Sequence, residues 1–228
     1  MKNFVSVAID GPAGAGKSTM ARAVAKELGF VYVDTGAIYR SVGYYITICG
    51  IGPKDVDGVT RLLDDINIEI KYNEDGKQCM ILNGRDISDE IRTAEMGECA
   101  SKLSTLKVVR DYLLDVQREL AATQNVVMDG RDIGTVVLPN AQVKIYMTAS
   151  AEVRAERRLK EFREKGDTKS TFNSVLQEIK QRDDRDMNRE IAPLKQAKDA
   201  VLLDTSDLSI DESIQALKRI IEEKMQNV

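Results

Sequence analysis

The chain contains no histidine, and its three cysteines are far apart. Histidine is the commonest general acid or base near neutral pH and the commonest metal ligand, so its absence excludes imidazole-dependent chemistry. Cys49, Cys79 and Cys99 are odd in number and form no C-x-x-C pair, which argues against a disulfide framework and against a zinc site. This cysteine usage is typical of a reducing compartment, and we expect a cytoplasmic protein.

The chain also lacks long apolar runs and an excess of basic charge. No apolar stretch is long enough to span a bilayer, and the strand-like residues 4–9 follow Met1 so closely that no signal peptide is expected. The formal net charge of −4 predicts no general attraction to nucleic acid or to anionic lipid. We therefore expect neither a nucleic-acid nor a membrane partner, and any anion site must be local.

The remaining composition favours one globular α/β unit. Its 228 residues, 43% hydrophobic and 31% charged, are enough to bury a sizeable core. Short apolar runs alternate with segments of helical periodicity, which is typical of a parallel sheet covered by helices. The predicted strands are residues 4–9, 31–33, 126–128, 143–147 and 201–203. Helices are expected after the first strand, along 106–120, and after a capping box at 209–212.

Two segments depart from this alternation. Residues 66–72 alternate apolar and polar side chains, and a turn at 73–76 separates them from the apolar run 79–82. This pattern predicts a small antiparallel lobe inserted into the parallel fold. Residues 151–193 are rich in arginine and acidic side chains, with a break between two helices at 166–170. The residues alone leave open whether this segment is a mobile lid or a solvated helical hairpin.

A complete phosphate-binding motif, G-x-x-x-x-G-K-[ST], lies between the first predicted strand and the first predicted helix. Its glycines let successive backbone N–H groups point at phosphate oxygens, and the following helix adds its positive dipole end. Lys17 is expected to reach the β- and γ-phosphates, and the Ser18 hydroxyl is expected to bind Mg²⁺. The residues expected to hold ATP are Gly11, Pro12, Ala13, Gly14, Ala15, Gly16, Lys17, Ser18 and Thr19.

Charged side chains also follow two other predicted core strands, where open α/β sheets bind their ligands. Residues 34–40 read Asp-Thr-Gly-Ala-Ile-Tyr-Arg, and residues 129–132 read Asp-Gly-Arg-Asp. Asp129 stands where a carboxylate can hold Mg²⁺. Taken alone, residues 34–40 are equally compatible with a tight turn, whereas two carboxylates and an arginine at one strand end favour a site at residues 129–132. The chain has no N-K-x-D motif, which argues against a regulatory GTPase, and it is short for a motor ATPase, so a small-molecule kinase remains.

These motifs together resemble those of the bacterial cytidylate kinases, within the nucleoside monophosphate kinases. The resemblance covers essentially the whole chain and is carried by residues 9–12, 34–40, 90–93, 129–132 and 182–186. It implies a P-loop NTPase fold with a five-stranded parallel sheet flanked by helices. It also implies one kinase domain over 1–228, with a core (about 1–34, 105–150 and 194–228), a monophosphate-binding lobe containing the antiparallel insert (about 35–104) and a helical lid (about 151–193).

The same resemblance implies ATP-dependent phosphorylation of CMP, and of dCMP, by direct in-line transfer with Mg²⁺. The implied acceptor-site residues are Ser101, Arg110 and Asp132 at the base, Arg40, Arg131 and Arg189 at the phosphate, Arg182 and Asp186 near the ribose, and Thr35 and Tyr39 beside them. The implied catalytic residues are Lys17, Arg131 and Arg158. A carboxylate at Asp132 would accept a hydrogen bond from the exocyclic amine of cytosine but would face an oxygen in uracil. Thr35 stands where the family often has serine, and it retains the hydroxyl.

Several alternatives stay open at this point. Arg182, Arg185 and Arg189 would lie on one helical face among acidic residues, a pattern that by itself indicates solvated ion pairs. The residues also do not show which lid arginine approaches the phosphates: Arg154, Arg157 or Arg158. Another small-molecule acceptor, or a nucleotide-binding regulator without turnover, would carry the same phosphate loop. No apolar surface stripe demands a partner, so we expect a monomer.

Overall fold

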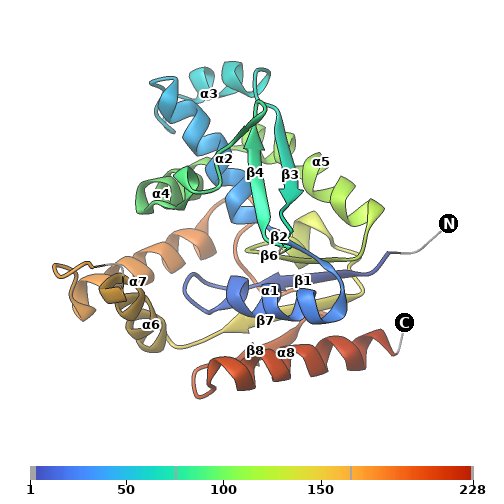
Figure 1. Cartoon of the computed structure of the whole chain (residues 1–228). Helices are drawn as coiled ribbons and strands as arrows, with labels where there is room; N and C mark the ends of the chain where they lie inside the picture. The colour runs from blue at the N-terminus through green and yellow to red at the C-terminus, as the bar shows by residue number, and fades with distance from the viewer. Residues whose placement is uncertain (1–3, 75, 165, 227–228) are drawn as a thin grey trace.

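A five-stranded parallel sheet, in the order β2-β6-β1-β7-β8, forms the centre of the computed structural model (Figure 1). The structure describes residues 4–74, 76–164 and 166–226. The strands are β1 (Ser6–Asp10), β2 (Val31–Asp34), β6 (Val126–Gly130), β7 (Val143–Thr148) and β8 (Val201–Asp204). All the core strands predicted from the sequence are confirmed, with bounds that differ by one or two residues. Residues 1–3 and 227–228, assigned to the core, lie outside the described residues.

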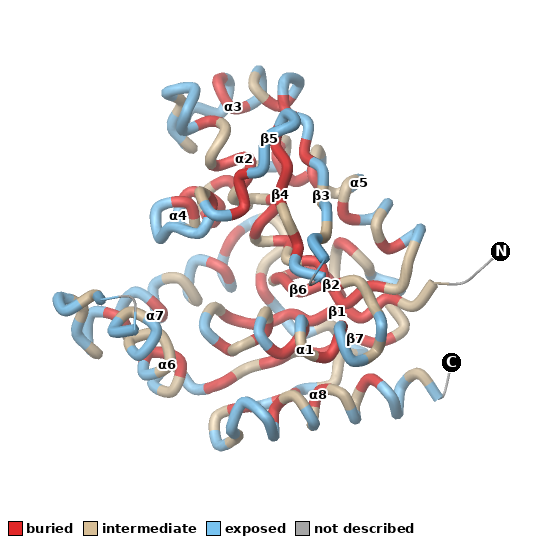
Figure 2. Tube along the Cα trace, viewed as in Figure 1, coloured by how far each residue is buried: buried red, intermediate tan, exposed pale blue. Residues whose placement is uncertain are grey.

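Helices cover both faces of this sheet, and successive strand residues enter different cores. On one face, Ala8 and Met128 pack with α2 (Thr35–Ile48) and α5 (Lys107–Thr123). On the other face, Ile9 and Val127 pack with α1 (Lys17–Leu28) and α8 (Ile210–Met225). Because both faces are buried, the strands read as continuous apolar runs. Figure 2 shows the buried residues concentrated in these strands and the exposed ones on the outer helix faces.

The helix boundaries follow local chemistry. Gly29 ends α1 in the left-handed conformation (φ 67°), as expected of a glycine C-cap. The predicted capping box at the start of α8 is confirmed, with Ser209 and Glu212 each bonding the backbone N–H of the other. None of the described helices combines the length and the apolar character needed to cross a bilayer.

The predicted antiparallel insert is confirmed and contains one strand more than expected. It comprises β3 (Ile68–Tyr72), β4 (Gln78–Leu82) and β5 (Arg85–Asp86). The third strand follows a turn in which Asn83 and Gly84 both have positive φ (49° and 83°), as a type I′ hairpin requires. Asp75, within the expected first turn, lies outside the described residues. Other elements near the insert are α3 (Val56–Leu63), η1 (Glu90–Arg92) and α4 (Ala94–Leu103).

The insert and the helical pair differ in how they join the sheet. Met80 and Leu82 of the insert belong to the same core as α2 and α5. The predicted helical pair α6 (Ala151–Glu164) and α7 (Phe172–Asn188) has a small core of its own, built on Ala155, Val175 and Ile179, and extends from the side of the sheet (Figure 1). The break between them is confirmed, and position 165 lies outside the described residues.

Asp10 fastens the end of β1 to the segment that follows β6. Its two carboxylate oxygens accept hydrogen bonds from the backbone N–H groups of Ile133 (2.7 Å) and Gly134 (2.8 Å), in the π-helical turn η2 (Ile133–Val137). The side chain is buried, and burial raises the pKa of Asp10 from 3.8 to about 6 even though the two backbone hydrogen bonds lower it.

We predict that Asp10 makes the protein less stable as the pH rises from about 4 to about 6. In this range the folded state keeps the Asp10 proton that the unfolded chain has lost, so the free energy of unfolding falls with increasing pH. Urea unfolding of the wild type and of Asp10→Asn across this range measures the effect as a difference. The free energy of unfolding of the wild type minus that of Asp10→Asn should fall by at most about 3 kcal/mol as the pH rises. A rise of this difference with pH would contradict the prediction.

Candidate active site

The candidate residues gather at the carboxyl ends of neighbouring parallel strands. β6 lies between β1 and β2, with Asp129 in register with Ile9 on one side and with Asp34 on the other. The phosphate-binding loop follows β1, residues 34–40 follow β2, and residues 129–132 follow β6. Three segments that are distant in the sequence therefore meet at one edge of the sheet.

The phosphate-binding loop lies so close to β7 that its first position requires glycine. A Cβ on Gly11, which has φ 151°, would lie 1.9 Å from the backbone oxygen of Met147. Gly14 and Gly16 also have left-handed backbone conformations, with φ of 76° and 83°. The helix α1 then begins at Lys17, as predicted, so its N-terminal N–H groups face the loop.

Lys17 is buried at the base of this loop. Its ammonium group donates a hydrogen bond to the backbone oxygen of Pro12 at 2.8 Å. Burial holds the pKa of Lys17 well below its usual value, and the nearby Arg131 guanidinium lowers it further. Asp129 and Asp10 act in the opposite direction but do not outweigh the burial. A polyphosphate beside Lys17 would favour the charged ammonium.

Ser18 and Asp129 are brought together as predicted. The Ser18 hydroxyl donates to one carboxylate oxygen of Asp129 at 2.8 Å, and the Tyr32 hydroxyl donates to the other at 2.8 Å. Burial raises the pKa of Asp129, and the Asp34 carboxylate nearby adds to this rise. Thr35 also lies here, and its hydroxyl donates to the backbone oxygen of Asp129 at 2.8 Å.

This pair of oxygen groups fits Mg²⁺. A hydroxyl and a carboxylate are hard oxygen ligands, and Mg²⁺ usually takes one or two protein ligands together with substrate phosphates and water. In the part of the chain that the structure describes, no group of three or more histidine, cysteine or acidic side chains is placed to hold a metal. An ion at Ser18 and Asp129 would therefore depend on the nucleotide for the rest of its coordination.

Asp132 joins two arginines that lie far from it in the sequence. One of its oxygens accepts from Arg189 at 3.0 Å, and the other forms an ion pair with Arg110. All three side chains are buried. Ser104, which the sequence analysis did not include, accepts a hydrogen bond from Arg189 at 3.0 Å. We call Arg110, Asp132 and Arg189 the Asp132 cluster.

Tyr39 lies beside this cluster, and Ser101 is joined to it through Ser104, whose hydroxyl donates to the backbone oxygen of Ser101 at 2.8 Å. Ser101 is buried in α4 and accepts a hydrogen bond from Arg185 of α7 at 3.4 Å, so α7 reaches the acceptor lobe. Burial raises the pKa of Tyr39 to about 12. Arg110 and Arg189 of the Asp132 cluster lower this pKa, and Asp132 raises it. Arg185 was not among the predicted site residues, although it lies in the segment 182–186 that carried the family resemblance.

A second cluster is built on Asp186. Its carboxylate accepts from Arg131 at 3.0 Å and lies 4.0 Å from Arg182. Asp186 is only 4% exposed, so the interpretation of this segment as solvated ion pairs is wrong here. Burial lowers the pKa of Arg182, with a further contribution from the charge of the neighbouring Arg131, to about 10. We call Arg131, Arg182 and Asp186 the Asp186 cluster.

The shared helical face expected for Arg182, Arg185 and Arg189 is also wrong in part. α7 ends at Asn188, and Arg189 is its C-cap with an extended backbone (φ −63°, ψ 142°). Leaving the helix turns the Arg189 chain toward Asp132, where its side chain is buried. The break in the helix, rather than helical periodicity, places this residue in the site.

Arg40 forms a separate part of the site at the start of α2. It donates to a carboxylate oxygen of Asp34 at 3.0 Å, while the other oxygen of Asp34 accepts the backbone N–H of Ala37 at 2.9 Å and caps the helix. Among the described residues, Arg40 forms no hydrogen bond or ion pair with the Asp132 or Asp186 cluster. Its Nε atom is buried without a hydrogen-bond partner.

The three lid arginines have different environments. Arg154 is buried and donates to the phosphate-loop oxygen of Ala13 at 3.0 Å and to Asp183 at 2.6 Å. Arg157 donates to the backbone oxygen of Thr205 at 2.7 Å. Arg158 keeps 43% of its side chain exposed, and its contacts within the described residues are a local ion pair with Glu161 on its own helix and a contact over the ring of Phe162.

Comparison with known proteins places the chain among nucleotide kinases. A model of the cytidylate kinase family matches residues 7–223. The cytidylate kinase of Thermosipho melanesiensis is 48% identical over 218 residues, covering 96% of this chain and 97% of its own. That of Caldicellulosiruptor bescii is 44% identical over 223 residues, covering 98% of each chain. Among solved structures, an uncharacterized protein from Eubacterium ventriosum has a similar fold, with a TM-score of 0.53 at 10% identity, over 96% of this chain and 98% of that chain.

The family match spans nearly the whole described chain, and three of the segments that carried the resemblance, 9–12, 34–40 and 129–132, lie at neighbouring strand ends on one edge of the sheet. The chain belongs to the cytidylate kinase family.

Proposed function

We propose that the protein transfers the γ-phosphoryl group of ATP to CMP, and to dCMP, in the presence of Mg²⁺. The observation that carries this proposal is the position of two arginine clusters beside a phosphate-binding loop. Gly11 and Arg131 each follow one of two paired strands, β1 and β6. The donor phosphates in the loop and the acceptor phosphate near Arg131 would therefore meet at the same sheet edge.

The Asp132 cluster supplies the chemistry for a cytosine base. Asp132 lies between the guanidinium groups of Arg110 and Arg189, and a carboxylate accepts hydrogen bonds only. Such a group would accept from the exocyclic amine of cytosine and would repel the oxygen that uracil carries there. Tyr39 lies next to this cluster and Ser101 is joined to it through Ser104, so the two supply apolar contact and a hydroxyl.

The Asp186 cluster and Arg40 supply the charge for the acceptor phosphate. One carboxylate, Asp186, lies against two guanidinium groups, so the cluster keeps a positive excess. A guanidinium has five N–H donors, and the contact with Asp186 uses only some of those of Arg131. We assign Arg131 to both the acceptor phosphate and the transferring group, because its charge also acts on Lys17.

The reaction needs positioning and charge neutralisation more than acid–base groups. An oxygen of the acceptor phosphate attacks the γ-phosphorus in line, and the bond from that phosphorus to the bridging oxygen of ADP breaks. The second pKa of a monophosphate is about 6, so the attacking oxygen is mostly deprotonated at neutral pH. This agrees with a chain that has no histidine. Bound Mg²⁺ would neutralise charge between the β- and γ-phosphates, and Ser18 and Asp129 are the residues that would hold it.

Within this proposal, residues 151–193 form a lid and residues 35–104 form the acceptor lobe. The lid has its own small core, which suits movement as a unit. Arg158 is the lid arginine whose side chain is both exposed and bound only to its own helix, so we assign it to the transferring phosphoryl group. Arg154 and Arg157 are held by backbone oxygens and have structural roles.

A panel of acceptors tests the function directly. Purified protein is incubated with ATP or GTP, Mg²⁺ and one of CMP, dCMP, UMP, AMP or GMP, and formation of the nucleoside diphosphate is followed. CMP and dCMP should be turned over fastest, with ATP as donor. Preference for another monophosphate would change the assigned acceptor, and slow turnover with every acceptor would favour a regulatory protein.

We predict that Lys17→Ala lowers turnover of CMP by about 10²- to 10³-fold, because the charge on the donor phosphates is no longer neutralised. The fold should stay intact, since Asp129 keeps the hydrogen bonds from Ser18 and Tyr32, and Asp10 keeps those from the backbone of η2. Lys26→Ala, an exposed change on the same helix, is the matched control and should retain wild-type turnover. Steady-state kinetics and urea unfolding measure the two effects, and near-normal turnover of Lys17→Ala would refute the role.

We predict that Asp132→Asn reduces the preference for CMP over UMP, expressed as the ratio of kcat/KM values, by about 10- to 100-fold. The asparagine side chain has an amide N–H that can donate a hydrogen bond to the oxygen of uracil. The substitution also removes the negative charge that repels this oxygen. Asp184→Asn, at an exposed position of α7, should leave the ratio unchanged. An unaltered ratio in Asp132→Asn would show that the base is read by other residues.

We predict that two adjacent lid arginines differ in the property they control. Arg158→Gln should lower kcat by about 10-fold or more with little change in the free energy of unfolding, because its side chain is exposed. Arg157→Gln should lower the free energy of unfolding by about 1–3 kcal/mol, because the Thr205 oxygen loses its donor. Kinetics and urea unfolding of both variants test this prediction. A lower kcat for Arg157→Gln together with a lower free energy of unfolding for Arg158→Gln would contradict it.

A further inference from the structure

The outer edge of β2 is covered by side chains of the insert instead of by another strand. β2 is the edge strand of the parallel sheet, so its outward backbone groups need other partners. The Tyr72 hydroxyl donates to the backbone oxygen of Tyr32 at 2.9 Å. The side-chain oxygen of Gln78 accepts the backbone N–H of Asp34 at 2.8 Å. Tyr72 and Gln78 are directly paired across β3 and β4, so one end of the hairpin closes this edge.

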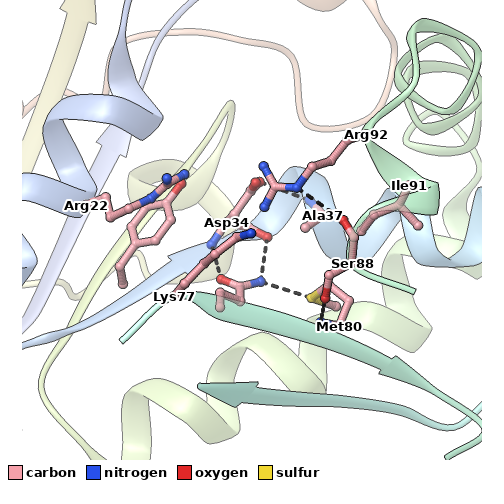
Figure 3. A pocket seen from close by; sticks show the side chains of 10 residues that line it. Arg22, Asp34, Ala37, Lys77, Met80, Ser88, Ile91 and Arg92 are labelled. Carbon is pink, nitrogen blue, oxygen red and sulfur yellow. Dashed lines mark hydrogen bonds between the residues drawn. The ribbon is translucent and has the colours of Figure 1, made fainter. Parts of the chain in front are cut away.

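Gln78 is held in one orientation. Its side chain is buried, and its amide nitrogen lies 3.0 Å from the sulfur of Met80 and 3.5 Å from the backbone oxygen of Asp34. Asp34, Met80 and Ser88 line the hollow between the sheet edge and the insert (Figure 3). A buried amide fixed in this way sets where the Asp34 backbone lies, because moving it would leave polar groups unpaired.

The backbone of Asp34 in turn determines the position of Arg40. The Asp34 carboxylate caps α2 through Ala37 and pairs with Arg40 at 3.0 Å. Both charged side chains are mostly buried, at 18% and 21% exposed, so the pair is better defined than a surface ion pair. Contacts therefore run without interruption from the Gln78 amide, through Asp34, to the Arg40 guanidinium.

We propose that Gln78 is a positioning residue for the acceptor phosphate, acting through Asp34 on Arg40. This inference rests on the proposed function, in which Arg40 binds the phosphate of CMP. It assigns to the insert an indirect part in substrate binding: the hairpin holds the strand end that positions the arginine. Gln78 does not touch the substrate, so its loss should weaken acceptor binding more than the chemical step.

Gln78→Met tests the proposal, because methionine has a similar length but cannot accept the Asp34 N–H. We expect KM for CMP to rise about tenfold, with KM for ATP and kcat changing by less than about twofold. If this variant does not fold, Gln78→Asn replaces it, since the shorter amide cannot reach Asp34 and the same rise is expected. An unchanged KM for CMP in a folded variant would overturn the proposal.

Tyr72→Phe is the matched control. It removes the neighbouring hydrogen bond to the same strand edge, from the paired position of the same hairpin, but leaves Asp34 untouched. Its KM for CMP should stay within about twofold of the wild type. A rise equal to that of Gln78→Met would show that any weakening of the contact between the insert and the sheet has this effect, and would overturn a specific role for Gln78.

A double-mutant cycle with Arg40→Met separates action through Arg40 from an independent effect. If Gln78 acts through Arg40, the Gln78 substitution should change KM for CMP little when Arg40 is already absent. Full additivity of the two effects would overturn the proposed route. The wild type is assayed first: no turnover of CMP refutes the proposed function and this inference together, whereas normal turnover with additive effects refutes only the inference.

Discussion

The site depends on two buried carboxylates that each hold two arginines in place. Asp132 lies between Arg110 and Arg189, and Asp186 lies against Arg131 and Arg182. Two cations beside one another repel, and a carboxylate between them offsets that repulsion. Burial lowers the pKa of Arg182, and the charge of Arg131 lowers it further. One carboxylate offsets part of the charge of two guanidinium groups and accepts only some of their N–H donors, so the others stay available to anionic ligands. The acids therefore set the geometry, while the excess of arginine sets the attraction for phosphate.

The parallel sheet and the phosphate-binding loop were predictable from the sequence because their signals are local. Continuous apolar runs mark strands buried on both faces, and the glycines of the loop stand where the backbone needs them, most clearly at Gly11. Asn83-Gly84 is a hairpin-turn signal, but the strand that follows it, Arg85–Asp86, is too short and too polar to show any periodicity. Prediction worked where one short segment contained the whole physical reason.

The rest of the site could not be predicted from the residues, because its contacts join distant positions. Arg189 meets Asp132 only because α7 stops at Asn188, and Gln78 meets Asp34 only because the insert closes on the sheet edge. Arg157 and Arg158 are adjacent and chemically identical, yet one is held by backbone oxygens and the other is exposed. The family resemblance named most of these residues, whereas the structure supplies the physical reasons for their positions.

The shifted pKa values at the phosphate-binding loop have a common origin in burial. Burial lowers the pKa of Lys17 and raises that of Asp129, so in the protein alone each group is driven toward its neutral form. A bound polyphosphate would raise the pKa of Lys17, because its negative charge favours the ammonium form. A bound divalent cation would lower the pKa of Asp129, because its positive charge favours the carboxylate form. The two shifts are therefore complementary to the two parts of a magnesium nucleotide. Neither group needs to exchange a proton during transfer, which is consistent with a phosphate acceptor that is already ionised.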